Sequence, residues 1–253
     1  MANAGILFAA NNDQNQLITV DTNTLAVTTI GSFGIDVSFG GMAYDGNTDT
    51  LYLVGGRRNN NLYSVNQSTG AATLIGSHGI EDLFGLAFDS LNNVLYASQF
   101  CCQPTLDLFS LDTITGAATN IGALNPGMGG LAYNSKTDQL IGIRDGAGDL
   151  YAIDRTNAAT TLLADPLGSV NDSGLTYDPD LDIFWDFDFN GNLVSFDPNN
   201  GYAVTTHISV VGFAVDGLAY KTGPNVRPVP EPSSLILAGL GLAAIGRMRR
   251  SRA

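Results

Sequence analysis

Acidic residues recur at one position of this sequence, a few residues before the copies of a repeated five-residue phrase. Four of the five copies have them, and the copy that starts at residue 130 has Asn125 instead. If the copies surround one axis, their carboxylates would meet in a ring that attracts a cation or a ligand rich in hydroxyl groups. The alternative is that they are turn residues and solubilising charge. The candidate ligand-binding residues are Asp36, Glu81, Asp82, Asp172 and Asp216.

Signatures of catalysis and of metal binding are weak. His78 and His207 lie in different copies of the repeat, and the sequence has no GxSxG or HExxH motif. A glycosidase would need two suitably spaced carboxylates, with Glu81 or an aspartate as general acid. Residues 186–197 match parts of a calcium loop, but the Asn-Gly pair between two strand-like segments favours a tight hairpin. We predict no catalytic residue, no metal site and no cofactor.

The two cysteines, Cys101 and Cys102, are adjacent. In an oxidising compartment they could form a vicinal disulfide, which would place a rigid sulfur-lined bump on a loop. Two free thiols are the alternative. Two cysteines are too few for a disulfide framework or a structural zinc site.

The elements that position these residues are repeated strands. The five-residue phrase occurs as GMAYD, GLAFD, GLAYN, GLTYD and GLAYK, starting at residues 41, 85, 130, 174 and 217. Three further segments recur in the same rhythm, such as LYSVN at 62–66 and ATLIG near 72. All are short, rich in β-branched and aromatic residues, and bounded by turn residues. Four strands in each period of about 44 residues are typical of a β-propeller blade.

The repeat predicts a closed ring of five blades in an all-β fold. The last phrase, at 217–221, has no following strands, and the three strands at 6–31 have no preceding phrase. Together they complete one blade and join the two ends of the ring. A ring of six or seven blades would need further sequence upstream. We call the strands of a blade a, b, c and d, from the centre outward.

The loops of a propeller lie on two faces. The a–b and c–d turns are short and alike in every copy, whereas the b–c and d–a loops vary in length and content. Variable loops on a rigid scaffold are where binding residues concentrate. We therefore expect any function on the face that carries the b–c and d–a loops.

Charge divides the chain into two parts. Residues 1–222 hold 23 acidic and 6 basic residues, a net charge of −17, and residues 223–253 have a net charge of +4. This shift predicts a propeller domain at 1–222 and a linker with a tail at 223–253. The acidic excess argues against a nucleic-acid partner, because that affinity comes from Lys and Arg.

The tail has three parts in a fixed order. A Pro-Glu-Pro motif comes first, an uncharged apolar segment at 235–246 follows, and an arginine cluster ends the chain. The apolar segment predicts a short helix of the transmembrane type, although it is shorter than the roughly 20 residues that span a bilayer. The arginines place the C-terminus in the cytoplasm. The sorting residues are Pro230, Glu231, Pro232, Arg247, Arg249 and Arg250.

These three parts resemble the PEP-CTERM sorting signal of Gram-negative bacteria, which is also catalogued as an ice-binding-protein C-terminal domain. The resemblance implies processing by a membrane exosortase near the Pro-Glu-Pro motif, export, and a link to exopolysaccharide or biofilm. The body resembles the YVTN and quinoprotein-like propellers, a similarity that carries over no active-site residue. Export also needs a signal peptide, which we expect upstream of Met1, since Ala2-Asn3-Ala4 matches a cleavage site.

Three functions fit these features. We favour an exported, non-catalytic propeller of the cell envelope or extracellular matrix that binds a polysaccharide or a surface protein. It would be held in the inner membrane by the tail until processing. A secreted polysaccharide hydrolase or lyase, using carboxylates at the channel mouth, is the alternative. The third is a structural matrix protein without a small ligand.

Overall fold

The structure is a computed structural model that describes residues 5–101, 103–168, 173–209 and 212–222. The chain divides into two compact units, Met1–Gly223 and Pro224–Ala253. The second unit, with the predicted tail helix, lies outside the described residues. Within the described ranges, no helix is long and apolar enough to cross a membrane.

The described residues of the first unit form twenty strands, and each blade takes one strand from each of four concentric positions. The inner strands are β20 (Val215–Lys221), β4 (Met42–Asp45), β8 (Leu83–Asp89), β12 (Gly130–Asn134) and β16 (Ser173–Asp178). The second strands are β1 (Ile6–Asn11), β5 (Thr50–Val54), β9 (Val94–Gln99), β13 (Gln139–Ile143) and β17 (Ile183–Asp188). The third strands are β2 (Gln16–Asp21), β6 (Asn61–Val65), β10 (Asp107–Leu111), β14 (Leu150–Ile153) and β18 (Asn192–Asp197). The outer strands are β3 (Val27–Ser32), β7 (Ala72–Ser77), β11 (Ala118–Ala123), β15 (Thr160–Ala164) and β19 (Ala203–Ser209), and the short 3₁₀ helix η1 (Pro198–Asn200) precedes β19.

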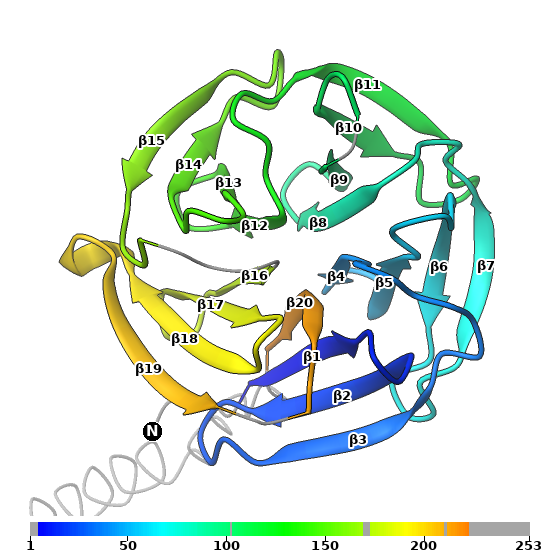
Figure 1. Ribbon diagram of the computed structural model, residues 1–253, viewed down its shortest axis with the longest axis horizontal. Helices are drawn as coiled ribbons and strands as arrows, with labels where there is room; N and C mark the ends of the chain where they lie inside the picture. The colour runs from blue at the N-terminus through cyan, green and yellow to red at the C-terminus, as the bar shows by residue number, and fades with distance from the viewer. Residues whose placement is uncertain (1–4, 102, 169–172, 210–211, 223–253) are drawn as a thin grey trace, which may run out of the picture. The chain divides into compact units, whose positions relative to one another are not determined.

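The strands make five four-stranded antiparallel sheets, which surround a common centre in Figure 1. Blade 1 contains β20 and β1–β3, and blades 2 to 5 follow in chain order. The predicted five-bladed propeller is confirmed.

The ring closes through blade 1, as the sequence predicts. Strand β20 pairs antiparallel with β1, with Ile6 opposite Lys221 and Ala10 opposite Gly217. The two ends of the chain therefore share one sheet, and the last inner strand covers an edge of β1 that would otherwise be open.

The glycine that begins the repeated phrase is explained by close packing of inner strands from neighbouring blades. A Cβ atom on Gly41 would lie 1.8 Å from the carbonyl oxygen of Phe84, and one on Gly217 would lie 2.4 Å from that of Gly40. Both obstacles are backbone atoms of the neighbouring blade and cannot rotate away. Only glycine lets the inner strands approach this closely.

The core lies between blades. One cluster, for example, packs Leu7 and Ile18 of blade 1 against Trp185 and Phe187 of blade 5, and all four are buried.

Polar contacts also cross every boundary between blades on the face of the a–b and c–d turns, which we call the turn face. They join Lys221 to Asp49, Asn47 to Asn93, Arg155 to Asp89, Lys136 to Asp182, and Tyr220 to Asp180.

Each outer strand contains a β-bulge at the same position. The pairing register shifts by one residue within the third and outer strands of all five blades. Four of the extra residues are aliphatic, and the fifth is His207. The His207 Nε2 atom lies 2.8 Å from Ser195 Oγ, and its ring packs on Trp185.

Both described ends of the propeller lie on the turn face, because β1 begins opposite the point where β20 ends. The opposite face carries the variable b–c and d–a loops, and we call it the loop face.

Candidate functional site

The loop face is hollowed at the boundary between blades 2 and 3. One hollow of about 480 Å³ is lined by Arg57, Arg58, Asn60, Glu81 and Asp82. A second, of about 460 Å³, shares Arg57, Arg58 and Asn60 with the first and extends to Asp36 and Tyr63. We call the two together the blade 2–3 groove.

The loop between β5 and β6 supplies the two arginines, and backbone hydrogen bonds hold it to the loop before β4. The Arg57 N–H donates to the Ser38 carbonyl over 2.7 Å, and the Ser38 N–H donates to the Gly55 carbonyl over 3.0 Å. Gly56 adopts a left-handed φ of +71°, and a Cβ there would lie 2.0 Å from the Ser38 oxygen. The glycine is therefore required for the two loops to meet.

Four neighbours fix the Arg57 side chain. Its Nε atom lies 3.8 Å from Asp82 Oδ1, and Nη2 donates to Cys101 Sγ over 3.0 Å. The guanidinium carbon lies 4.7 Å from the ring centre of Phe39 and 5.9 Å from that of Phe84, which is a cation–π arrangement. Phe39 also stacks on Phe189 of blade 5, at 5.7 Å between ring centres.

Arg58 differs from the other bases of the propeller. The structure describes all six of them, and four form close ion pairs: Lys136 with Asp182, Arg144 with Asp149, Arg155 with Asp89 and Asp138, and Lys221 with Asp49. Arg57 pairs at longer range with Asp82. Arg58 is exposed, and among the described residues no carboxylate lies within ion-pair distance of it.

The far wall of the groove is acidic. Asp82 is 7% exposed and accepts a hydrogen bond from Gln103 Nε2 over 3.2 Å, whereas Glu81 is exposed. The Gln99 side chain donates to the Glu81 carbonyl over 2.8 Å, and the Phe100 N–H donates to the Asp82 carbonyl over 3.0 Å. The loop after β9 is thus attached to the loop before β8.

Asn59 and Asn60 form the near wall of the groove. Asn59 is held in place by hydrogen bonds to the Asp36 carbonyl and from Tyr63. Asn60 accepts the backbone N–H of His78 at its carbonyl, and its buried Oδ1 has no hydrogen-bond partner among the described residues. Burial lowers the pKa of His78 to about 4, so the ring is neutral at pH 7.

The structure brings some of the predicted residues together. Asp36, Glu81 and Asp82 line the groove, whereas the buried Asp216 lies in β20. Asp172 lies outside the described residues, so the acidic ring stays a prediction. Cys101 is disulfide-bonded and contacts Arg57, but Cys102 lies outside the described residues, and the vicinal bridge also stays a prediction.

The segment weighed as a calcium loop forms the β17–β18 hairpin. The Asp188 carboxylate accepts the N–H groups of Asn190 and Asn192, over 3.0 and 2.7 Å, and so stabilises the turn. Among the described residues, no three His, Cys, Asp or Glu side chains are placed to hold a metal ion.

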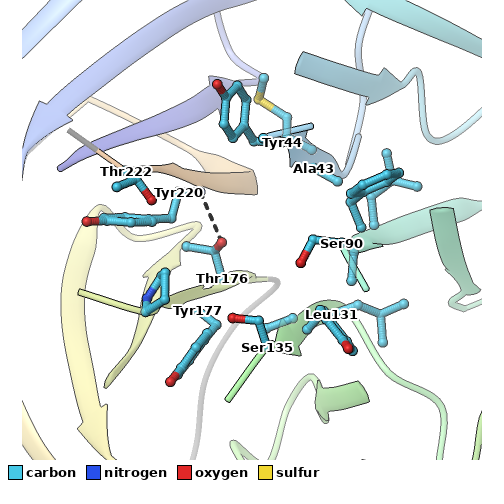
Figure 2. A pocket seen from close by; sticks show the side chains of 17 residues that line it. Ala43, Tyr44, Ser90, Leu131, Ser135, Thr176, Tyr177, Tyr220 and Thr222 are labelled. Carbon is cyan, nitrogen blue, oxygen red and sulfur yellow. Dashed lines mark hydrogen bonds between the residues drawn. The ribbon is translucent and has the colours of Figure 1, made fainter. Parts of the chain in front are cut away.

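A smaller cavity of about 150 Å³ occupies the mouth of the central channel on the turn face and is lined by inner strands of all five blades. Figure 2 shows Tyr44, Tyr177 and Tyr220 around it, with the Ser90 and Ser135 hydroxyls. The Tyr44 hydroxyl donates to Asp49 over 2.6 Å and that of Tyr220 to Asp180 over 2.9 Å. Burial and these carboxylates raise the pKa of both phenols, so they remain neutral donors.

Sequence reasoning did not select Arg57, Arg58 or Asn60. One available signal was their rarity, because two of only six bases in residues 1–222 are adjacent, in a b–c loop of the predicted variable face.

Comparison with known proteins identifies the tail. Residues 228–250 match the family model described as the PEP-CTERM protein-sorting motif. The chain carries a PEP-CTERM sorting motif. The motif indicates an exported protein that is transiently anchored in a membrane and processed by an exosortase. The predicted sorting residues, from Pro230 to Arg250, fall within the match and lie outside the described residues.

Solved structures support the fold of the propeller. A chain from a crystal structure of a nidogen/laminin complex is similar with a TM-score of 0.59 and 12% identity, covering 85% of this chain and 80% of that one. A structural-genomics protein of unknown function from Bacteroides thetaiotaomicron has a TM-score of 0.57 and 19% identity, covering 83% and 57%. No curated protein matches the sequence significantly. These similarities show the fold alone.

Proposed function

We propose that this protein is a non-catalytic binding module of the cell envelope or extracellular matrix, and that the blade 2–3 groove binds polysaccharide. The observation that carries the proposal is the composition of the groove. The groove combines guanidinium groups, an amide and carboxylates. The Arg57 guanidinium that lines it is held over the rings of Phe39 and Phe84. Planar polar groups of this kind form paired hydrogen bonds with vicinal hydroxyl groups.

The arrangement of the carboxylates favours binding over hydrolysis. A general acid needs a carboxyl group that stays protonated near neutral pH, which requires burial away from positive charge. Asp82 instead lies beside the positively charged Arg57 and accepts a hydrogen bond from Gln103. Glu81 is exposed on the wall of the groove.

The location follows from the sorting motif and the charge of the tail. The arginine cluster would keep the C-terminus in the cytoplasm, with the propeller across the inner membrane. Cleavage near Pro230 would then release an acidic propeller into the envelope or matrix, where exopolysaccharide and biofilm components are the available ligands. The loop face is free of both described chain ends, which leave from the turn face.

A polysaccharide array probed with the full chain tests this function, with and without calcium. We expect binding that falls about tenfold in Glu81→Ala, because a charge-assisted hydrogen bond contributes roughly 1.5–3 kcal/mol. Asp13→Ala is the matched control, since Asp13 is also an exposed acid of the loop face and does not line the groove. Binding to no polysaccharide, or release of reducing sugar from a bound one, would contradict the proposal.

A further inference from the structure

We infer that the groove selects an anionic polysaccharide, one that carries uronic acids, and that Arg58 binds the sugar carboxylate. The inference rests on the proposed function and names its ligand class. It goes beyond the acidic-ring prediction, which would favour cations and neutral sugars.

The charge distribution is the first argument. The propeller has a net charge of −17, so it does not attract anions in general. Its other five bases all have carboxylate partners, and the pairs of Lys136, Arg155 and Lys221 lie on the turn face. Arg58 is the exposed base without such a partner among the described residues, and it lies where the two hollows of the groove meet. An unpaired guanidinium at that point is suited to an external carboxylate.

The second argument is that the site is formed before any ligand arrives. The Arg57 backbone N–H is hydrogen-bonded to the Ser38 carbonyl. The Arg57 side chain is held by a cation–π contact with Phe39, an ion pair with Asp82 and a hydrogen bond to Cys101. Asn59, which follows Arg58 in the chain, donates a side-chain hydrogen bond to the Asp36 carbonyl. A ligand therefore has to order little besides the Arg58 side chain, which reduces the entropy cost of binding.

The third argument concerns the neighbours of Arg58. Asp36 and Glu81 are exposed carboxylates, and each lines one of the two hollows that share Arg58. Carboxylates accept hydrogen bonds from hydroxyls. They also repel closely spaced charges, such as those of a polyphosphate or a nucleic acid. A chain with one carboxylate on each sugar and free hydroxyls between them satisfies both conditions.

Polygalacturonate and its fully methyl-esterified form are the probes, because esterification removes the charge of each carboxyl group and leaves the sugar backbone unchanged. Binding to the full chain is measured in EDTA, so that bridging calcium is absent, and at two salt concentrations. We expect the acid to bind at least tenfold more tightly than the ester, and the difference to shrink as salt rises. Arg58→Gln should lose that preference, and Arg58→Lys should keep part of it.

Lys136→Gln is the matched control, because it removes one positive charge from the turn face. It should leave binding unchanged. Equal binding of the acid and the ester, or equal losses in Arg58→Gln and Lys136→Gln, would overturn the anionic ligand while leaving a polysaccharide-binding function in place. If neither polymer nor any neutral polysaccharide binds, the proposed function itself fails.

Discussion

Burial of His78 predicts that the propeller loses stability between pH 7 and pH 5. The side chain is 5% exposed, its Nδ1 accepts the Ile80 N–H over 3.2 Å, and within the described part of the chain its Nε2 has no hydrogen-bond partner. Burial lowers the pKa of His78 from 6.5 to about 4. The folded state therefore disfavours the proton that the unfolded chain accepts.

The sign and size of the effect follow from this difference. Unfolding takes up a proton below pH 6.5, so the free energy of unfolding falls as the pH falls through 6.5, and the loss levels off below about pH 4. With 1.36 kcal/mol for each pKa unit, the loss from pH 7 to pH 5 is about 2 kcal/mol.

Urea unfolding at pH 7 and pH 5 measures this loss. His78→Asn keeps an acceptor for the Ile80 N–H but cannot take up the proton, so it should remove most of the pH dependence. His207, whose pKa burial also lowers, contributes a smaller part, and the double variant with His207→Gln should be nearly insensitive to pH in this interval. A variant His78→Asn that loses as much stability as the natural protein would refute the reasoning.

Two further substitutions test how the blades are joined. Gly41→Ala places a Cβ 1.8 Å from the Phe84 carbonyl oxygen and should lower the free energy of unfolding by about 3 kcal/mol in urea unfolding. Gly46→Ala is the control, because its Cβ would meet only Tyr44 Cε1, at 3.8 Å. It should change the free energy of unfolding by less than about 0.5 kcal/mol. Arg155→Met leaves the Asp89 carboxylate, which is 0% exposed, without its partner and should cost about 3 kcal/mol, partly restored by Asp89→Asn. Lys136→Met breaks the more exposed ion pair with Asp182 and should lower the free energy of unfolding by under about 1 kcal/mol in the same assay. Equal losses of stability in Arg155→Met and Lys136→Met would contradict the argument that the buried pair matters more.

The sequence predicted the elements of this fold well because the repeat encodes them locally. Each phrase of the GLAYD type became an inner strand, and the lone phrase at 217–221 showed how the ring closes. The bulges of the outer strands could not be predicted, because the extra residue is Ile in three blades but His207 in blade 5. Pairing with the third strand, not residue type, decides its position.

The groove was only partly predictable, because it joins residues distant in the sequence. Glu81 and Asp82 were selected by their place in the repeat, but the arginines opposite them belong to another loop of another blade. The contact between Arg57 and Asp82 depends on the bridge from Ser38 to Gly56, and no local pattern encodes that bridge.

A crystal structure of the full chain with a tetramer of galacturonic acid tests the central claim most directly. The account predicts the oligosaccharide in the blade 2–3 groove, with one carboxylate about 3 Å from the Arg58 guanidinium and sugar hydroxyls on Asp36 or Glu81. An oligosaccharide bound instead in the cavity of the turn face, beside Tyr44 and Tyr220, or at an acidic channel mouth away from Arg58, would contradict it.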